Sequence, residues 1–225
     1  MKIIRIFVLI LISVILVSCS SGRKIQSGED AASHLNLPDV QVEAYLFDVK
    51  LRRNGKPTTV RLDLYQTDSV VAMYGRGYFN KGAFRGRITN DSMLIYFPST
   101  NEFLNESIEN LFLSFDCESE LIGINLLGYF IAPPDSSRIS RNLSVETTEE
   151  SGDVKQLMIS SKSCKWRLLL GYRKEKNGWR LELFEFDDSD NVTLKGSRRQ
   201  YKDKAAVSGD RFHIRIKPAA LKITL

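Results

Sequence analysis

The cysteine at position 19 has the most specific chemical context in this chain. It follows a positively charged start, with Lys2 and Arg5, and a predominantly apolar segment over residues 7–17. That segment is far shorter than the roughly 20 residues that a membrane-spanning helix needs, so it predicts a cleaved signal peptide. A thiol placed directly after such a peptide is a candidate for covalent attachment of lipid.

The four residues Leu16-Val17-Ser18-Cys19 resemble the lipobox of bacterial lipoproteins. In a lipobox the peptide is cut before the cysteine, and the cysteine sulfur carries a diacylglycerol. By this resemblance, residues 1–18 are a signal peptide and Cys19 is an acylated N-terminus. Each buried methylene contributes about 0.8 kcal/mol, so a multiply acylated cysteine would hold the protein on a membrane. The alternative is a buried cysteine that follows an ordinary signal peptide.

Composition divides the rest of the chain into a tether and a domain. Residues 19–37 are rich in small and charged residues and have little hydrophobic periodicity, which predicts a tether. Residues 38–225 have single-domain length and enough apolar side chains for one core. The net charge of +5 falls to +3 without residues 1–18, which contain Lys2 and Arg5 but no acidic residue. Basic and acidic residues are interspersed, so we expect no nucleic-acid partner.

The other chemically active residues form no recognisable motif. Besides Cys19, Cys117 and Cys164 remain, and they either form a disulfide or are two small buried side chains. Neither has a second Cys or His at ligand spacing, and His34 and His213 form no pair, so we expect no metal and no cofactor. The chain contains no G-x-S-x-G and no H-E-x-x-H, so we expect no enzyme. The alternative, an enzyme, would have to recruit His213 without a local signature.

Alternation of apolar and polar residues predicts a mainly β domain. The alternation is clearest over residues 60–64, 212–216 and 221–225. Turn pairs such as Asn54-Gly55 and Asn177-Gly178 separate the candidate strands at short intervals, which favours a sequential antiparallel meander. The further candidate strands are residues 42–53, 69–75, 82–89, 92–97, 154–160, 165–173 and 179–186.

One segment, residues 102–131, departs from this pattern, because its apolar residues are spaced more like those of helices. We expect two short helices, over residues 106–115 and 119–129, ended by Pro133-Pro134. Their apolar residues cover more than one face, as expected for helices packed into a concave sheet.

A lipobox, a tether, antiparallel strands, a helical insertion and further strands, in this order, resemble the LolA/LolB family of periplasmic lipoprotein-handling proteins. The resemblance is densest over residues 46–115, where a strand ending in Ile95-Tyr96-Phe97-Pro98 leads into the helical segment. It implies a mainly β (α+β) fold, with a strongly curved antiparallel sheet or incomplete β-barrel. A helical lid is then inserted between two groups of strands. It also implies an apolar concave cavity that binds acyl chains or lipoproteins.

The anchor favours the LolB-like, membrane-bound side of this family. Ser20 stands where an aspartate often signals inner-membrane retention in proteobacteria. We therefore expect a lipid-anchored protein of the cell envelope, on the periplasmic face of the outer membrane, with a role in lipoprotein localisation or envelope biogenesis. The alternative is a structural or assembly lipoprotein that docks an envelope protein partner and binds no lipid.

Apolar residues of the expected strands and helices are the candidates for the inner face of such a cavity. The alternative for each of them is an ordinary place in the core. The strand candidates are Val60, Leu62, Leu64, Met73, Phe84, Ile95, Phe97, Leu168, Leu170, Leu181 and Leu183, and the lid candidates are Leu111, Phe112, Ile122 and Leu126.

Replacement of the anchor residue tests the lipobox. Cys19→Ala should abolish incorporation of radiolabelled palmitate, because the variant has no thiol after the apolar segment. Cys117→Ala is the matched control and should incorporate palmitate like the wild type. Incorporation by Cys19→Ala at the wild-type level would contradict the lipobox assignment.

Overall fold

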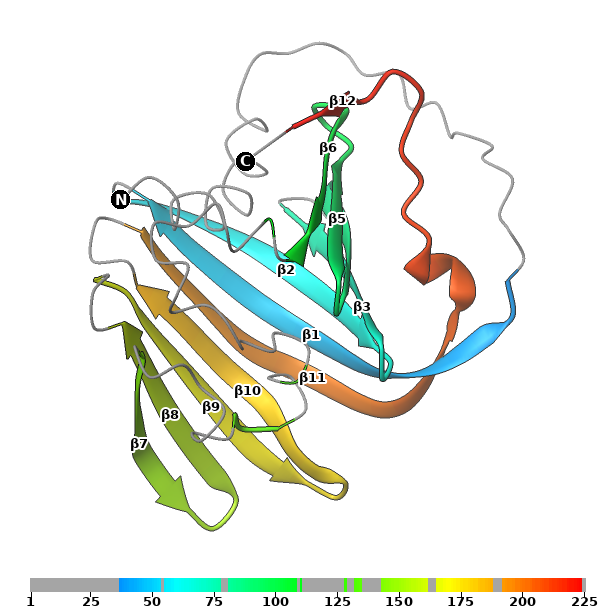
Figure 1. Ribbon diagram of the computed structural model, residues 1–225. Coiled ribbons are helices and arrows are strands. Elements are labelled where there is room, and N and C mark those ends of the chain that lie inside the picture. The colour runs from blue at the N-terminus through cyan, green and yellow to red at the C-terminus, as the bar shows by residue number, and fades with distance from the viewer. Residues whose placement is uncertain are drawn as a thin grey trace.

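The described part of the chain forms one twelve-stranded β-sheet (Figure 1). The computed structural model describes residues 37–223, with gaps at 54, 78–80, 109, 111–127, 129–131, 135–142, 162–164 and 188–191. A short 3₁₀ helix, η4 (Gly209–Phe212), precedes the last strand. The strands are β1 (Asp39–Arg53), β2 (Lys56–Gln66), β3 (Val70–Arg76), β4 (Gly82–Thr89), β5 (Ser92–Phe97), β6 (Glu102–Ser107), β7 (Leu143–Ser151), β8 (Val154–Ser161), β9 (Arg167–Glu175), β10 (Gly178–Asp187), β11 (Val192–Ser208) and β12 (Leu221–Lys222).

Two antiparallel meanders make up this sheet. Strands β1 to β6 pair in chain order, and so do strands β7 to β11. Antiparallel pairing of β1 with β11, from Asp39 opposite Ser208 to Arg53 opposite Val192, joins the two meanders. Strand β12 adds in parallel to β6. The described order therefore runs from β12 to β7 without closing, and the prediction of a curved, open, mainly antiparallel sheet is confirmed.

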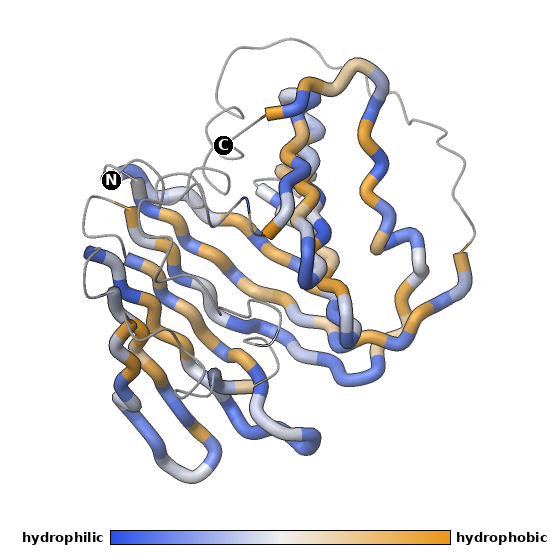
Figure 2. The backbone as a smooth tube through the Cα atoms, viewed as in Figure 1, coloured by the Kyte–Doolittle hydropathy of each residue, from blue (hydrophilic) through white to orange (hydrophobic). Residues whose placement is uncertain are grey.

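Alternation of side chains explains why these segments form strands. In β2 the residues Val60, Leu62 and Leu64 are buried, and the polar residues between them are partly exposed. Hydropathy alternates in the same way along the tubes of neighbouring strands (Figure 2). Strands β4 and β5 have the predicted bounds. Between β1 and β2, Gly55 has a φ of 77°, which an Asn-Gly hairpin turn favours.

Bulges and glycines accompany the curvature of the sheet. Register shifts in the β1–β11 pair place an extra β11 residue at two positions, between Val42 and Ala44 and between Leu46 and Phe47 of β1. Such bulges bend a strand and increase its twist. Gly75 is opposite Phe84, and a Cβ atom on Gly75 would lie 2.1 Å from the Phe84 ring. The absence of a Cβ on Gly75 thus leaves room for the Phe84 ring over the neighbouring strand.

Most of the expected helical lid lies outside the described residues, and the part that is described differs from the prediction at its start. Glu106 and Ser107, which we expected in a helix, end strand β6. The Ser107 hydroxyl accepts a hydrogen bond of 2.9 Å from the backbone N–H of Asn110, as in a helix N-cap, and Ile108, Asn110 and Gly128 have helical backbone. The rest of both expected helices lies outside the described residues. The prediction was wrong at β6 because its apolar residues Phe103 and Leu104 are adjacent, so they do not alternate with polar residues as in the other strands.

The prediction of a strand over residues 212–216 is wrong. Phe212 ends η4, and residues 213–217 form no strand. An extended chain alternates its side chains even when no partner strand is beside it, so alternation alone does not identify a strand. Of the expected strand over residues 221–225, Leu221 and Lys222 pair with β6, and residues 224–225 lie outside the described residues. Leu221 is 67% exposed.

Besides β6, strands β7 and β11 were not predicted from the sequence. The edge strand β7 is mostly exposed and polar, and β11 carries many charged residues. Neither shows the apolar alternation by which the other strands were recognised. The bulges in β11 also interrupt what periodicity it has.

Close packing of Gly75 against Phe84 leads to a stability prediction. Gly75→Ala should lower the free energy of unfolding by about 1–3 kcal/mol, because the buried Phe84 ring has to move. Gly77→Ala, two residues later, should change it by less than about 0.5 kcal/mol, since its Cβ would meet no atom within 4 Å. Urea denaturation measures both. Equal stability of the two variants would refute the close approach.

Candidate functional site

A continuous apolar layer covers one face of the sheet. It has buried residues from every strand from β1 to β10, and Leu194 and Tyr201 of β11 pack against it. We call this set the inner layer. Its buried members are Tyr45, Phe47, Val49, Val60, Leu62, Leu64, Val71, Met73, Phe84, Ile88, Met93, Ile95, Phe97, Leu104, Leu143, Leu157, Ile159, Trp166, Leu170, Tyr172 and Leu181.

Most of the expected inner-face residues meet in this layer. Among the strand candidates named from the sequence, Leu168 is partly buried and packs against the layer, and Leu183 is not a member. The remaining strand candidates are all buried members, namely Val60, Leu62, Leu64, Met73, Phe84, Ile95, Phe97, Leu170 and Leu181. The anchor, the expected lid residues and the two other cysteines lie outside the described residues, namely Cys19, Leu111, Phe112, Ile122, Leu126, Cys117 and Cys164.

The expectation for Leu183 is wrong because of a β-bulge in β10. Leu181 is opposite Tyr172, which belongs to the inner layer, but the register then shifts and Leu183 is opposite Gly171. A Cβ on Gly171 would lie 2.6 Å from the Leu183 side chain, so the two residues share the outer face. One extra residue reverses which face the following residues occupy. Phe184, which was not among the candidates, faces the inner layer instead.

The outer face carries charge. Asp48, between the buried residues Phe47 and Val49, lies 3.1 Å from Arg199 Nε and 3.9 Å from Arg61 Nε. These side chains are 31–57% exposed. Exposed pairs of this kind contribute little to stability, but they make the outer face hydrophilic. The sheet is thus apolar on one face and charged on the other.

A buried polar cluster interrupts the inner layer near the start of β1. The Arg180 guanidinium, with only 8% of its side chain exposed, donates to Glu43 Oε1 at 2.5 and 3.0 Å and to the Tyr201 hydroxyl at 3.2 Å. It also donates to the Trp179 carbonyl at 2.7 Å. The Tyr45 hydroxyl donates to Glu43 Oε2 at 2.7 Å. This cluster was not predicted, because its members are far apart in the sequence.

Burial and hydrogen bonding fix the protonation states in the cluster. Burial raises the pKa of Tyr45, and the hydrogen bond to Glu43 raises it further. Burial likewise raises the pKa of Tyr201. Burial acts to lower the pKa of Arg180, but the hydrogen bonds to Glu43 and Tyr201 outweigh it, so the net direction is upward. Both tyrosines are therefore neutral, and Arg180 is charged, at neutral pH.

Two buried donors beside the inner layer lack a hydrogen-bond partner in the described structure. One is Nε1 of Trp166, whose residue is 4% exposed. The other is Nη1 of Arg198. Such a donor costs about 1–3 kcal/mol when nothing satisfies it, so each marks a place where a bound group would be stabilised.

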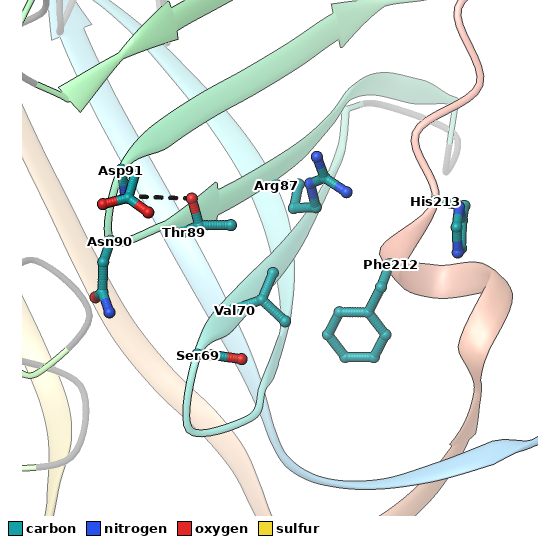
Figure 3. Close-up of a pocket in the computed structure, with 8 residues that line it drawn as sticks. All are labelled: Ser69, Val70, Arg87, Thr89, Asn90, Asp91, Phe212 and His213. Atoms are coloured by element: carbon teal, nitrogen blue, oxygen red, sulfur yellow. Dashed lines mark hydrogen bonds between the residues drawn. The ribbon is translucent and has the colours of Figure 1, made fainter.

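A separate pocket of about 390 Å³ opens on the outer face near the β2–β3 and β4–β5 turns. Phe212 and His213, from the segment after β11, lie across from Val70 and Arg87 (Figure 3). The Thr89 hydroxyl accepts from the backbone N–H of Asp91 at 3.3 Å, so it holds the turn. The remaining lining residues are Ser69 and Asn90. The sequence did not predict this pocket, because residues 212–216 were expected to form a strand.

The described residues contain neither a metal-binding group of side chains nor a membrane-spanning helix. Within residues 37–223, apart from the gaps, no three His, Cys, Asp or Glu side chains are grouped so that they could hold a metal ion. In the same residues, no helix is both long and apolar enough to cross a membrane.

Comparisons with known proteins find only distant similarity. No family model and no curated protein matches the chain. Among solved structures, it is similar to an uncharacterised conserved protein from Thermus thermophilus, with 12% identity, a TM-score of 0.45 and coverage of 84% of this chain and 91% of the other. A DUF1329 family protein from Desulfovibrio piger has 11% identity, a TM-score of 0.37 and coverage of 77% and 90%.

A third solved structure is named as an outer membrane lipoprotein-sorting protein domain, from Vibrio parahaemolyticus. It shares 10% identity with this chain at a TM-score of 0.40, and the match covers 76% of this chain and 88% of the other. All three similarities are too distant to transfer a function.

Removal of the carboxylate from the polar cluster should destabilise the protein. Glu43→Gln should lower the free energy of unfolding by about 2–3 kcal/mol, because Arg180 would stay buried without its counterion. Glu185→Gln is the matched control. Glu185 pairs with Lys195 at 2.6 Å on exposed side chains, so its loss should cost less than about 1 kcal/mol. Urea denaturation compares the two, and equal losses would contradict the role of the cluster.

Proposed function

We propose that this protein is a lipid-anchored envelope protein that binds acyl chains, free or attached to lipoproteins, on its inner layer. The observation that carries the proposal is the continuity of that layer across eleven neighbouring strands of an open sheet. An apolar sheet face has to be covered by another apolar surface. Each methylene of an acyl chain that is buried there would add about 0.8 kcal/mol.

The asymmetry of the two faces supports this proposal. Charged residues on the outer face, such as Asp48, Arg61 and Arg199, favour contact with water. The inner layer consists of aliphatic and aromatic side chains, which suit a flexible hydrocarbon chain better than a polar ligand. A polar ligand would bring groups for which the layer offers few partners.

A helical lid remains part of the proposal. The segment between β6 and β7 connects the two meanders, and the N-cap at Ser107 is the kind of contact that starts a helix. Apolar residues expected in this segment, including Leu111 and Phe112, would then cover a bound chain.

The anchor completes the proposed function. An acylated Cys19 would hold the protein on the outer membrane, and strand β1 begins at Asp39. A fully extended tether between them reaches on the order of 60 Å. The sheet would thus act close to the membrane in lipoprotein localisation or envelope biogenesis.

Substitution of neighbouring leucines on opposite faces of β9 tests the binding site. Leu168 packs against the inner layer, whereas Leu169 lies opposite Glu185 on the outer face. Leu168→Asn should weaken binding of a fluorescent fatty acid about tenfold, because it removes apolar contact and leaves an amide unsatisfied, a cost of about 1–3 kcal/mol. Leu169→Asn should bind like the wild type. Titrations use the chain without residues 1–19, which keeps every described strand.

Thermal unfolding of both variants controls for loss of the fold. If the folded wild-type chain binds no fatty acid, or if both folded variants bind equally well, acyl-chain binding is refuted. The docking of an envelope protein partner would then be the better hypothesis.

A further inference from the structure

Arg198 places a charged side chain against the inner layer. It is opposite Phe47, a fully buried member of the layer, and directly opposed residues of antiparallel strands share a face. The Arg198 guanidinium carbon lies 5.3 Å from the centre of the Tyr201 ring, which packs against the same layer. Only 7% of the Arg198 side chain is exposed.

The hydrogen bonding of Arg198 is incomplete. Its Nη2 donates to Glu175 Oε1 at 2.5 Å, but its buried Nη1 has no hydrogen-bond partner in the described structure. Arg180, by contrast, uses Nε, Nη1 and Nη2 in its contacts within the polar cluster. A guanidinium presents its donors as a planar fork that suits the oxygen atoms of an acid group. Arg198 therefore has a donor free for a ligand that carries such a group.

A β-bulge sets the direction of this side chain. Phe47 is opposite Arg198 and Leu46 is opposite Gln200, so Arg199 is the extra residue of β11. Arg199 points to the outer face, where its Nε lies 3.1 Å from Asp48. The bulge brings Arg198 and Tyr201, three residues apart, to the same face, which regular alternation would prevent.

Apolar side chains continue from Arg198 along the strands. Gly196 is opposite Phe184, whose ring occupies the space that a Cβ on Gly196 would need. Leu194 and Phe186 follow, opposite one another, and both pack against buried core residues. A hydrocarbon chain that starts at Arg198 would therefore meet only apolar side chains along this path.

We infer that the acyl ligand is an anionic amphiphile whose acid headgroup binds Arg198 Nη1 while its chain lies over Phe184, Leu194 and Phe186. This inference rests on the proposed acyl-chain binding and specifies the class of its ligand. Glu175 keeps its own bond to Nη2, and with 30% of its side chain exposed it remains partly solvated. Tyr201 is neutral, because burial raises its pKa, so it does not repel the acid. A neutral alcohol or ester of the same chain length would lack the charge-assisted hydrogen bond.

Ligands with the same chain length and different headgroups distinguish the contribution of the headgroup to binding from that of the hydrocarbon tail. Dodecanoate, dodecyl phosphate and dodecanol are titrated into the chain without residues 1–19, together with its Arg198→Met and Arg199→Met variants. Arg198→Met should weaken binding of the two acids about tenfold relative to dodecanol. Arg199→Met, which changes the adjacent arginine on the outer face, should leave the ratio of each acid's affinity to the affinity for dodecanol unchanged. Arg198→Lys keeps the charge without the fork and should give an intermediate ratio, and it replaces Arg198→Met if that variant does not fold.

Each outcome decides the inference. Unchanged ratios in folded Arg198 variants would overturn it, and Nη1 would then face no more than a water molecule. Inorganic phosphate should bind far more weakly than dodecyl phosphate, and equal affinities would mean a site for a free anion. If the wild type binds none of the three dodecyl ligands, both the inference and acyl-chain binding fail. If it binds dodecanol but Arg198 does not affect the ratios, only the inference fails.

Discussion

Pairing between β1 and β11 holds the two halves of the described sheet together. Each meander is built from hairpins between strands that are close in the sequence, whereas this pair joins residues 39–53 to residues 192–208. The inner layer continues across this pair, where Tyr201 is opposite Tyr45 and the Phe47 and Phe184 ring centres lie 5.6 Å apart. Long-range pairing has a large entropic cost, which burial of a shared apolar face offsets.

The irregularities of that pair also position the polar groups. At the first bulge, strand β11 has one extra residue opposite Glu43 of β1. Glu43 accepts hydrogen bonds from both Arg180 and Tyr45. The extra residue Arg199 directs Arg198 toward the inner layer. Bulges that bend the sheet are therefore also the places where charged side chains reach an otherwise apolar face.

The two buried arginines, Arg180 and Arg198, differ in how many of their donors have hydrogen-bond acceptors. Arg180 has a carboxylate, a hydroxyl and a carbonyl as acceptors, as a buried charge normally requires. Arg198 has a carboxylate at one nitrogen, an aromatic ring nearby and no acceptor at Nη1 in the described structure. This difference separates a group that stabilises the fold from one that is available to a ligand.

Local sequence pattern was sufficient for much of the fold. Residues 82–89 and 92–97 were predicted with the observed bounds, and the hairpin turn at Gly55 was predicted from its Asn-Gly pair. It failed where a strand lacks apolar alternation, as in β7 and β11, and where an alternating segment such as residues 213–217 forms no strand. Alternation reports which face a side chain prefers, and it does not report whether a neighbouring strand exists.

The sequence by itself determined the β class, most strand positions and nine of the 21 buried members of the inner layer, because an apolar residue at every second position must face a core. Only the tertiary structure decided that β1 pairs with β11 and that Leu183 faces outward. It also decided that Arg198 faces inward. The reason is physical: a bulge shifts the phase of a strand according to its partner, and hydrogen-bond satisfaction depends on residues far away in the chain.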